Sequence, residues 1–295
     1  DEVCSSCHQP EKFAGRGHHF HRQGGSGASC VACHMPVRRH MVVAELHDHS
    51  LRVPRPDLTV SLGEENAPNA CNGCHRDRSA SGSARAVRRW YPKGRSGTPH
   101  YARALAVGRG YGPGAERALL ATFRDPRLPG IVRATAISLL PAHLTAASLP
   151  VLQKAAGDPD PLVRLATASV MAALAPKERL KAGVTLLWDP VRAVRIEAAP
   201  AFADVPDAEL ASEQRAAFDR ALDDYLLAQR ANAERPEAHV RIGVVFAKRG
   251  RFAEARRAYE AALRMAPWFV PAHVQLAELL QLQGREDEGE AVLRQ

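Results

Sequence analysis

Cys71-Asn72-Gly73-Cys74-His75 is the stretch that decides the fold of the first third of the chain, and two earlier stretches repeat its pattern. They are Cys4-Ser5-Ser6-Cys7-His8 and Cys30-Val31-Ala32-Cys33-His34. Two thiols separated by two residues can each bond a vinyl group of one porphyrin, and the His that follows can bind its iron. The three stretches use all six cysteines of the chain. They therefore predict three covalently bound c-type haems, with His8, His34 and His75 as iron ligands.

Two other uses of a Cys-x-x-Cys pair fit this sequence less well. A redox disulfide does not need a His directly after its second Cys, yet that His occurs here three times. A structural zinc site combines two such pairs, so three pairs would leave one without a partner. Haem is the interpretation that uses every motif.

Length and charge exclude some classes of function. The 295 residues have room for two or three domains, and the formal net charge is +8. Two propionates on each of three haems would reduce this charge to about +2. Nucleic-acid binding is therefore not expected, and no RNA-recognition signature or compact basic helix supports it. No apolar run approaches the ~18 residues of a membrane span.

The cofactor also predicts a compartment. In bacteria, haem is attached to this motif outside the cytoplasmic membrane, so we expect a periplasmic or extracellular protein. The chain begins at Asp1 and carries no signal peptide. We expect the export signal to lie upstream of Asp1, in a part that was processed or trimmed away.

Residues 1–91 are rich in Gly, Pro, Ser and His and have little helix or strand periodicity. Such a composition cannot bury enough side-chain surface to fold alone. We expect a loop-rich module that folds around its haems, with short helical turns at the motifs. Six further histidines could supply the second iron ligands, and the residues alone do not choose among them: His18, His19, His21, His40, His47 and His49.

Four stretches of this module resemble a known family. They are His18-His19-Phe20-His21, the residues Cys30 to Pro36, the residues Asp48 to Pro56, and Asn69 to His75. The family is that of bacterial multihaem cytochromes with doubled C-x-x-C-H motifs followed by tetratricopeptide repeats. It is distantly similar to the cytochromes related to hydroxylamine oxidoreductase.

The resemblance implies low-potential, bis-His haems that transfer electrons. It favours His18, His21 and His49 as second ligands, with His19 in reserve, and it does not pair them with haems. Family members usually carry further haem motifs upstream and a longer helical array. Some ligands or neighbouring haems are therefore expected from a missing segment or another subunit.

A break rich in Gly, Pro and Ser opens the segment 92–123, which we interpret as a linker with first helices. An internal repeat then covers 124–206. Asp-Pro pairs at 125, 158 and 189 precede Val-Arg pairs at 132, 163 and 194, the last three 31 residues apart. Asp before Pro predicts a helix N-cap with Pro at the first helical position. The pattern resembles HEAT-type repeats.

From residue 207 the period changes to 34, since Tyr225 and Tyr259, and also Gly250 and Gly284, are 34 residues apart. This spacing, with Pro267 at a turn, resembles tetratricopeptide repeats over 207–295. His239 and His273 recur at one repeat position, which favours a structural role. The whole chain is thus predicted to be mainly α, a haem module followed by a helical solenoid.

Three functions remain open at this point. The first is electron transfer through three bis-His haems, with the solenoid docking redox partner proteins or other cytochrome subunits. The second is a catalytic multihaem oxidoreductase acting on nitrogen or sulfur oxyanions at one open haem, which Arg38, Arg39, His40 and His47 could line. The third is a haem-bearing structural subunit of a homo- or hetero-oligomer or filament. An electron carrier is favoured over an enzyme, because the supply of His gives no hint of an open haem.

Overall fold

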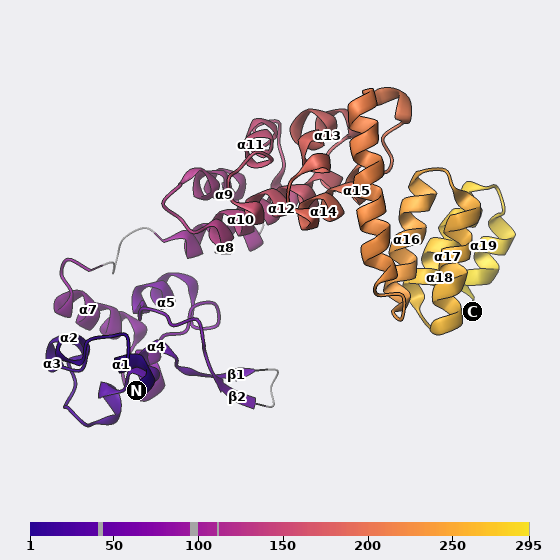
Figure 1. Ribbon diagram of the computed structural model, residues 1–295. Helices are drawn as coiled ribbons and strands as arrows, with labels where there is room; N and C mark the ends of the chain where they lie inside the picture. The colour runs from indigo at the N-terminus through magenta and orange to yellow at the C-terminus, as the bar shows by residue number, and fades with distance from the viewer. Residues whose placement is uncertain (41–43, 95–99, 111, 295) are drawn as a thin grey trace. The chain divides into compact units, whose positions relative to one another are not determined.

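The computed structural model describes residues 1–40, 44–94, 100–110 and 112–294, without the side chains of Arg39 and His40. The chain forms two compact units, Asp1–Ala106 and Val107–Gln295. Helices dominate both units (Figure 1), so the predicted mainly α class is confirmed.

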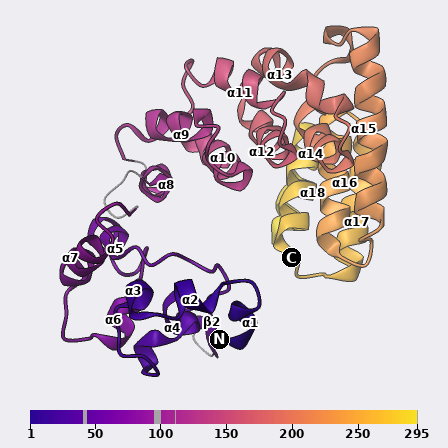
Figure 2. The same cartoon turned by 60° about the vertical axis from the view of Figure 1, so that its left-hand side comes forward.

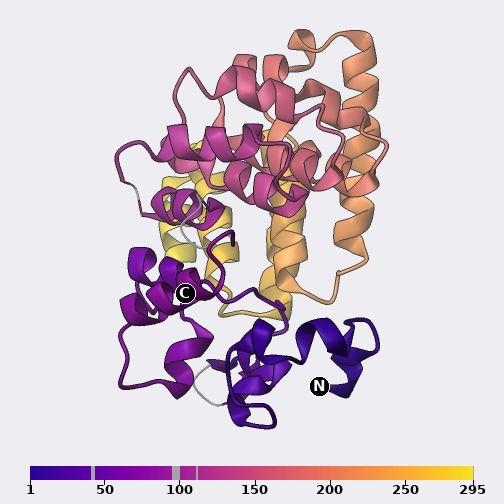
Figure 3. The same ribbon diagram turned by 90° about the vertical axis from the view of Figure 1, so that its left-hand side faces the viewer.

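The first unit consists of short elements joined by loops (Figure 3). One pair of strands, β1 (Val37–His40) and β2 (Ala44–His47), forms an antiparallel hairpin in which Val37 lies opposite His47. This hairpin was not predicted from the sequence. The helices are α1 (Glu2–Ser5), α2 (Pro10–Phe13), α3 (Arg16–His19), η1 (Ser26–Ala28), α4 (Cys30–His34), α5 (Pro56–Leu62), α6 (Ala70–Cys74), α7 (Ala80–Trp90) and α8 (Tyr101–Arg109), which crosses the division between the units.

The first unit buries very little of its own side-chain surface. From Asp1 to Arg55, none of the described side chains is buried. A small core forms where α5 packs against α7, with Leu58 of α5 and Ala84 of α7 buried there. A core of this size supplies little stability, so this unit is the part of the chain with most to gain from a bound apolar group.

The second unit begins with stacked helix pairs that follow the 31-residue period. Its buried side chains are mainly Leu, Val and Ala, in a chain with only 5% aromatic residues. The elements are α9 (Ala115–Arg124), α10 (Gly130–Ser138), η2 (Leu140–His143), α11 (Leu149–Ala155), α12 (Pro161–Val170), η3 (Met171–Ala173), α13 (Pro176–Gly183), η4 (Val184–Trp188), α14 (Arg192–Phe202) and η5 (Asp207–Glu209).

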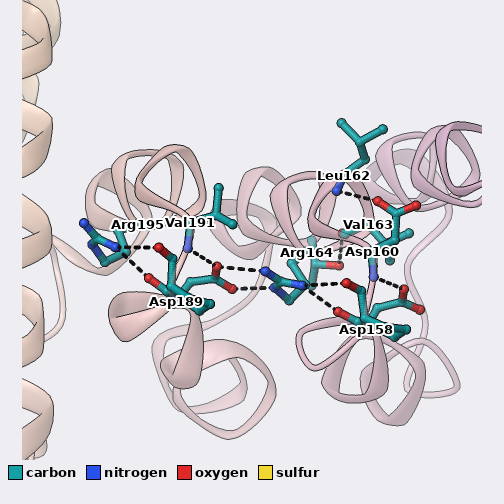
Figure 4. Close-up of polar contacts among 11 residues, drawn as sticks. Asp158, Asp160, Leu162, Val163, Arg164, Asp189, Val191 and Arg195 are labelled. Atoms are coloured by element: carbon teal, nitrogen blue, oxygen red, sulfur yellow. Dashed lines mark hydrogen bonds and ion pairs between the residues drawn. The ribbon is translucent and has the colours of Figure 1, made fainter.

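The repeated Arg and Asp residues join successive repeats (Figure 4). Arg164 donates two hydrogen bonds to the carboxylate of Asp189, at 2.5 and 3.0 Å, and one to the carbonyl of Asp158, at 2.8 Å. Arg133 makes the equivalent pair with Asp158, at 2.7 and 3.0 Å. Each Asp also accepts the N–H two residues further on. The ladder therefore fixes the register between neighbouring helix pairs.

The predicted N-caps are wrong at these positions. Helix α12 starts at Pro161 and its cap is Asp160, whose carboxylate accepts the N–H of Leu162 at 2.9 Å. Helix α14 starts at Arg192 with Val191 as its cap residue. Asp158 and Asp189 stand before these caps, where their carboxylates are committed to Arg of the preceding repeat.

The 34-residue repeats follow in the same unit, as α15 (Ser212–Arg230), α16 (Pro236–Lys248), α17 (Phe252–Met265), α18 (Val270–Leu282) and α19 (Glu286–Leu293). Figure 2 shows α15 to α18 side by side. Gly250 and Gly284 follow α16 and α18 with φ of 69° and 73°, as expected for glycines that end a helix. A Cβ at Gly243 would lie 2.3 Å from the Tyr259 ring, so only glycine permits this helix crossing.

The two kinds of repeat form one stack. Asp224 of α15 accepts hydrogen bonds from Arg195 at 2.7 Å and from Arg192 at 2.8 Å, which continues the Arg–Asp ladder into the second array. The recurring histidines make the same contact in both repeats, as a structural role predicts. His239 and His273 each donate from Nε2 to a backbone carbonyl, at 2.9 and 2.7 Å.

Candidate metal centres

The three Cys-x-x-Cys-His motifs lie at short helices of the first unit. Cys4 is in α1, the second motif spans α4, and Cys71 and Cys74 are in α6, with His75 as its C-cap. All six cysteines lie in the described residues, and none of them forms a disulfide. Both thiols of each pair are therefore available to bond a porphyrin.

Side-chain amides hold the third motif in place. Asn69 caps α6 by accepting the N–H of Asn72 at 3.1 Å, and its own amide donates to Thr59 at 3.1 Å. The Asn72 amide donates to the carbonyl of Arg78 at 2.6 Å and accepts from the Ser83 hydroxyl at 3.3 Å. Through these bonds the motif is tied to α5 and α7, which form the small core of the unit.

The second motif is tied to the segment that follows the hairpin. His34 donates from Nδ1 to the carbonyl of Arg52 at 2.8 Å, and the N–H of Arg52 donates to the carbonyl of His34 at 3.1 Å. At the other end of α4, the Asp1 carboxylate accepts from the Ser29 hydroxyl at 3.2 Å and from the N–H of Val31 at 3.4 Å. The cap residue of α1, the helix that carries Cys4, is therefore bonded to the second motif.

The structure places two pairs of histidines close together, with nearly parallel rings. The rings of His18 and His34 have centroids 6.1 Å apart and planes 12° from parallel. The rings of His21 and His75 have centroids 5.9 Å apart and planes 25° from parallel. A metal–imidazole bond is about 2 Å and the ring centre lies roughly 1 Å behind the nitrogen, so two ligands of one iron have centroids about 6 Å apart. Each pair therefore has the ring spacing of two ligands of one haem iron.

Hydrogen bonds at Nδ1 support the assignment of these histidines as iron ligands. A carbonyl oxygen only accepts, so the nitrogen that faces it carries the proton and the opposite nitrogen keeps its lone pair in the neutral ring. His34 bonds the carbonyl of Arg52 through Nδ1, and His21 bonds that of His19 through Nδ1 at 2.5 Å. This arrangement leaves Nε2 for a metal, which is how metal-binding histidines are usually held.

The remaining candidate ligands differ in whether a ring nitrogen is left to bind iron. His19 donates from Nε2 to Ala14 at 3.1 Å and accepts the N–H of His21 at Nδ1, so neither nitrogen is left for iron. His47 and His49 both donate from Nδ1 to carbonyls at 2.8 Å and keep Nε2 available. Within the described residues, however, no ring contact joins His49 to a motif histidine.

The first motif has a different neighbour. The ring in contact with His8, among the described residues, is that of Phe13, with centroids 5.3 Å apart and planes at 85°. Phe13 also meets His18 edge-on at 5.3 Å. The structure therefore brings the first motif close to the second, but among the side chains that it describes no imidazole is in ring contact with His8.

The second and third motifs lie close together. Helix α4 packs against α6. Burial raises the pKa of the Cys33 thiol, and the neighbouring Cys74 raises it further; burial and Cys33 act in the same way on the pKa of Cys71. Burial, followed by the charges of His34 and His19, lowers the pKa of His18. A lowered pKa favours the neutral imidazole, which is the form that binds a metal.

Of the four residues that could line an open haem site, two have described side chains. Arg38 pairs with Asp48 at 3.0 Å, and His47 is bonded to Met35, while the side chains of Arg39 and His40 lie outside the described residues. Among the described residues, no group of three or more His, Cys, Asp or Glu is placed to hold a metal ion. A haem iron needs only two ligands from the protein, because the porphyrin supplies four nitrogens. A pair of imidazoles is therefore enough.

Tyr91 also belongs to the site, although no motif in the sequence marks it. Its hydroxyl donates to the carbonyl of His18, and its oxygen lies 3.4 Å from Nδ1 of the same residue. A Tyr 73 positions away from its partner has no local pattern that would reveal such a contact.

Comparisons with known proteins identify the helical repeats. A HEAT repeat model matches residues 149–177 and a tetratricopeptide repeat model matches residues 246–295. These are the two repeat types expected from the 31- and 34-residue periods. No curated protein and no solved structure matches the chain. In the part of the chain that the structure describes, no helix has both the length and the apolar character needed to cross a membrane.

Proposed function

We propose that this protein is a multihaem c-type cytochrome that transfers electrons through three covalently bound haems. It would act in the periplasm or outside the cell, where such haems are attached. Its helical repeats would dock redox partner proteins or other cytochrome subunits, since stacked repeats present extended binding surfaces. HEAT and tetratricopeptide repeats are modules for contacts between proteins, which supports this part of the proposal.

The observation that carries the proposal is the pairing of His34 with His18 and of His75 with His21, each at about 6 Å beside a Cys-x-x-Cys pair. When bound, haem supplies one-electron redox chemistry between Fe(II) and Fe(III). Iron with two His ligands needs no substrate position, which suits an electron carrier.

The chain's own residues hold these two sites close together. His18 and His21 are three positions apart, so their Cα atoms are separated by about 11 Å at most. The contact between α4 and α6 does the same for the cysteines. Close spacing favours electron transfer between the second and third haems, and the Asp1 and Phe13 contacts bring the first motif to the same group.

Covalent haem content tests the proposal directly. Protein produced in cells competent in cytochrome maturation is expected to carry three haems, measured by intact mass and by the pyridine haemochrome assay. Electron paramagnetic resonance should show low-spin ferric iron for the second and third motifs. A colourless protein whose mass equals that of the polypeptide would refute the proposal.

The surroundings of His8 favour a second candidate, an oxidoreductase with one open haem. Because the ring in contact with His8 within the described part of the chain is that of Phe13 and not an imidazole, we expect the first haem to be the one that accepts an added ligand. Carbon monoxide titrated into the reduced protein should then bind at one equivalent per three haems, and Cys4→Ala with Cys7→Ala should abolish that binding. If no carbon monoxide binds, all three irons are saturated and the electron-carrier function stands alone.

A further inference from the structure

Three aromatic side chains surround the turn that carries His18 and His21. Phe20 lies between these histidines with φ of 58°, a left-handed backbone that a bulky residue rarely adopts. The Trp90 ring stacks on Phe20, with centroids 4.8 Å apart and planes 3° from parallel. Tyr91 meets Phe20 edge-on, at 5.6 Å and 81°. The end of α7 thus holds a turn from the start of the chain in an unusual conformation.

The Tyr91 hydroxyl reaches His18 at two points. It donates its proton to the His18 carbonyl, and its oxygen lies 3.4 Å from His18 Nδ1, where it can accept the ring proton. His34 and His21 also have an oxygen acceptor at Nδ1, but in both cases it is a backbone carbonyl. Among these three ligands, His18 is the one whose acceptor is a side chain and can be removed by substitution.

We propose that Tyr91 is a positioning residue for His18, which it holds with Nε2 directed to the iron of the second haem and makes a stronger electron donor. This inference rests on the proposed function. An acceptor at Nδ1 raises the basicity of a ligating imidazole. A more basic ligand stabilises ferric over ferrous iron, so Tyr91 would keep the reduction potential of this haem low.

Tyr91 also stands close to the same motif on its cysteine side. Burial raises the pKa of the Tyr91 hydroxyl, and the neighbouring Cys33 raises it further. The geometry at His18 lets one hydroxyl serve two groups: it donates to the His18 carbonyl while its oxygen can accept from the ring.

The test is a redox titration of the full-length, haem-loaded Tyr91→Phe protein. Phenylalanine keeps the ring contact with Phe20 and removes only the hydroxyl. We expect the haem content to stay at three, one reduction potential to shift to a more positive value, and the other two to stay unchanged. The low-spin resonance signal of the same haem should change with it.

Two further variants separate tuning from packing. Tyr225→Phe removes a hydroxyl that donates to the Arg241 carbonyl at 3.3 Å in the helical repeats, and it should leave all three potentials unchanged. Trp90→Leu removes the stack on Phe20 but no hydroxyl, so it should lower the melting temperature and shift the potential of the second haem less than Tyr91→Phe does. If Trp90→Leu shifts that potential further, Tyr91 acts through packing and the proposal is wrong.

The remaining outcomes are also decisive. A change of the second haem alone from low-spin to high-spin iron in Tyr91→Phe would support the proposal, because His18 would no longer be held at that iron. Three unchanged potentials, or loss of all three haems together, would overturn it. A wild-type protein without covalent haem would refute the proposed function itself, which distinguishes that failure from the failure of this inference.

Discussion

Replacing Cys71 and Cys74 together with alanine is expected to lower the haem content from three to two and to unfold residues 1–91. Helix α6 contacts both α4 and α7, so the group bonded to these thiols would lie between the second motif and the small core. From Asp1 to Arg55 none of the described side chains is buried. Losing one haem would therefore cost more stability than the roughly 3–5 kcal/mol that a core of this size supplies.

Haemochrome assay and limited proteolysis check this result. The variant should be cleaved rapidly within residues 1–91, while the fragment from Val107 onward stays folded, because it buries its own core of Leu, Val and Ala. Cys4→Ala with Cys7→Ala is the matched control. It also removes one haem, but it leaves both imidazole pairs, so the module should stay more resistant to protease. An unchanged haem content in the α6 variant would contradict the assignment.

The sequence predicted the helical repeats well because their signals are local and periodic. The 31- and 34-residue spacings depend on residues that pack in the same way in each unit. Gly250 and Gly284 could be recognised as helix ends in the sequence, because a position with left-handed backbone after a helix favours glycine. The Arg–Asp ladder was misread as a set of N-caps, because Asp before Pro fits a cap equally well and its partner lies in another repeat, 25 residues away.

The haem module was predictable in its chemistry but not in its geometry. The Cys-x-x-Cys-His motif identifies the two thiols and the first iron ligand, because these three residues must be close in sequence to reach one porphyrin. The second ligand has no such constraint. His18 lies opposite His34, which follows it, and not opposite His8, which is nearer in the sequence. Contacts between distant segments, such as that of Tyr91 with His18, produce no regular spacing in the sequence from which they could be predicted.

Asp189→Ala is expected to destabilise the helical repeats by about 3 kcal/mol, since removing one partner leaves the other charge buried and unpaired. The Asp189 side chain is 4% exposed and that of Arg164 is 12% exposed. Asp189 also accepts the N–H of Val191 at 2.8 Å just before α14, and this bond would be lost as well. Chemical denaturation followed by circular dichroism measures the change.

Asp125→Ala is the matched control, because Asp125 also stands before a Pro at the head of a repeat but pairs with Arg127, whose side chain is 86% exposed. An exposed ion pair contributes about 0–1 kcal/mol, so this variant should unfold close to the wild type. Replacing Arg164 and Asp189 together with leucine should recover much of the loss, since no buried charge then lacks a partner. Equal small effects of Asp125→Ala and Asp189→Ala would mean that apolar packing alone sets the register of the stack, and that the ladder only follows it.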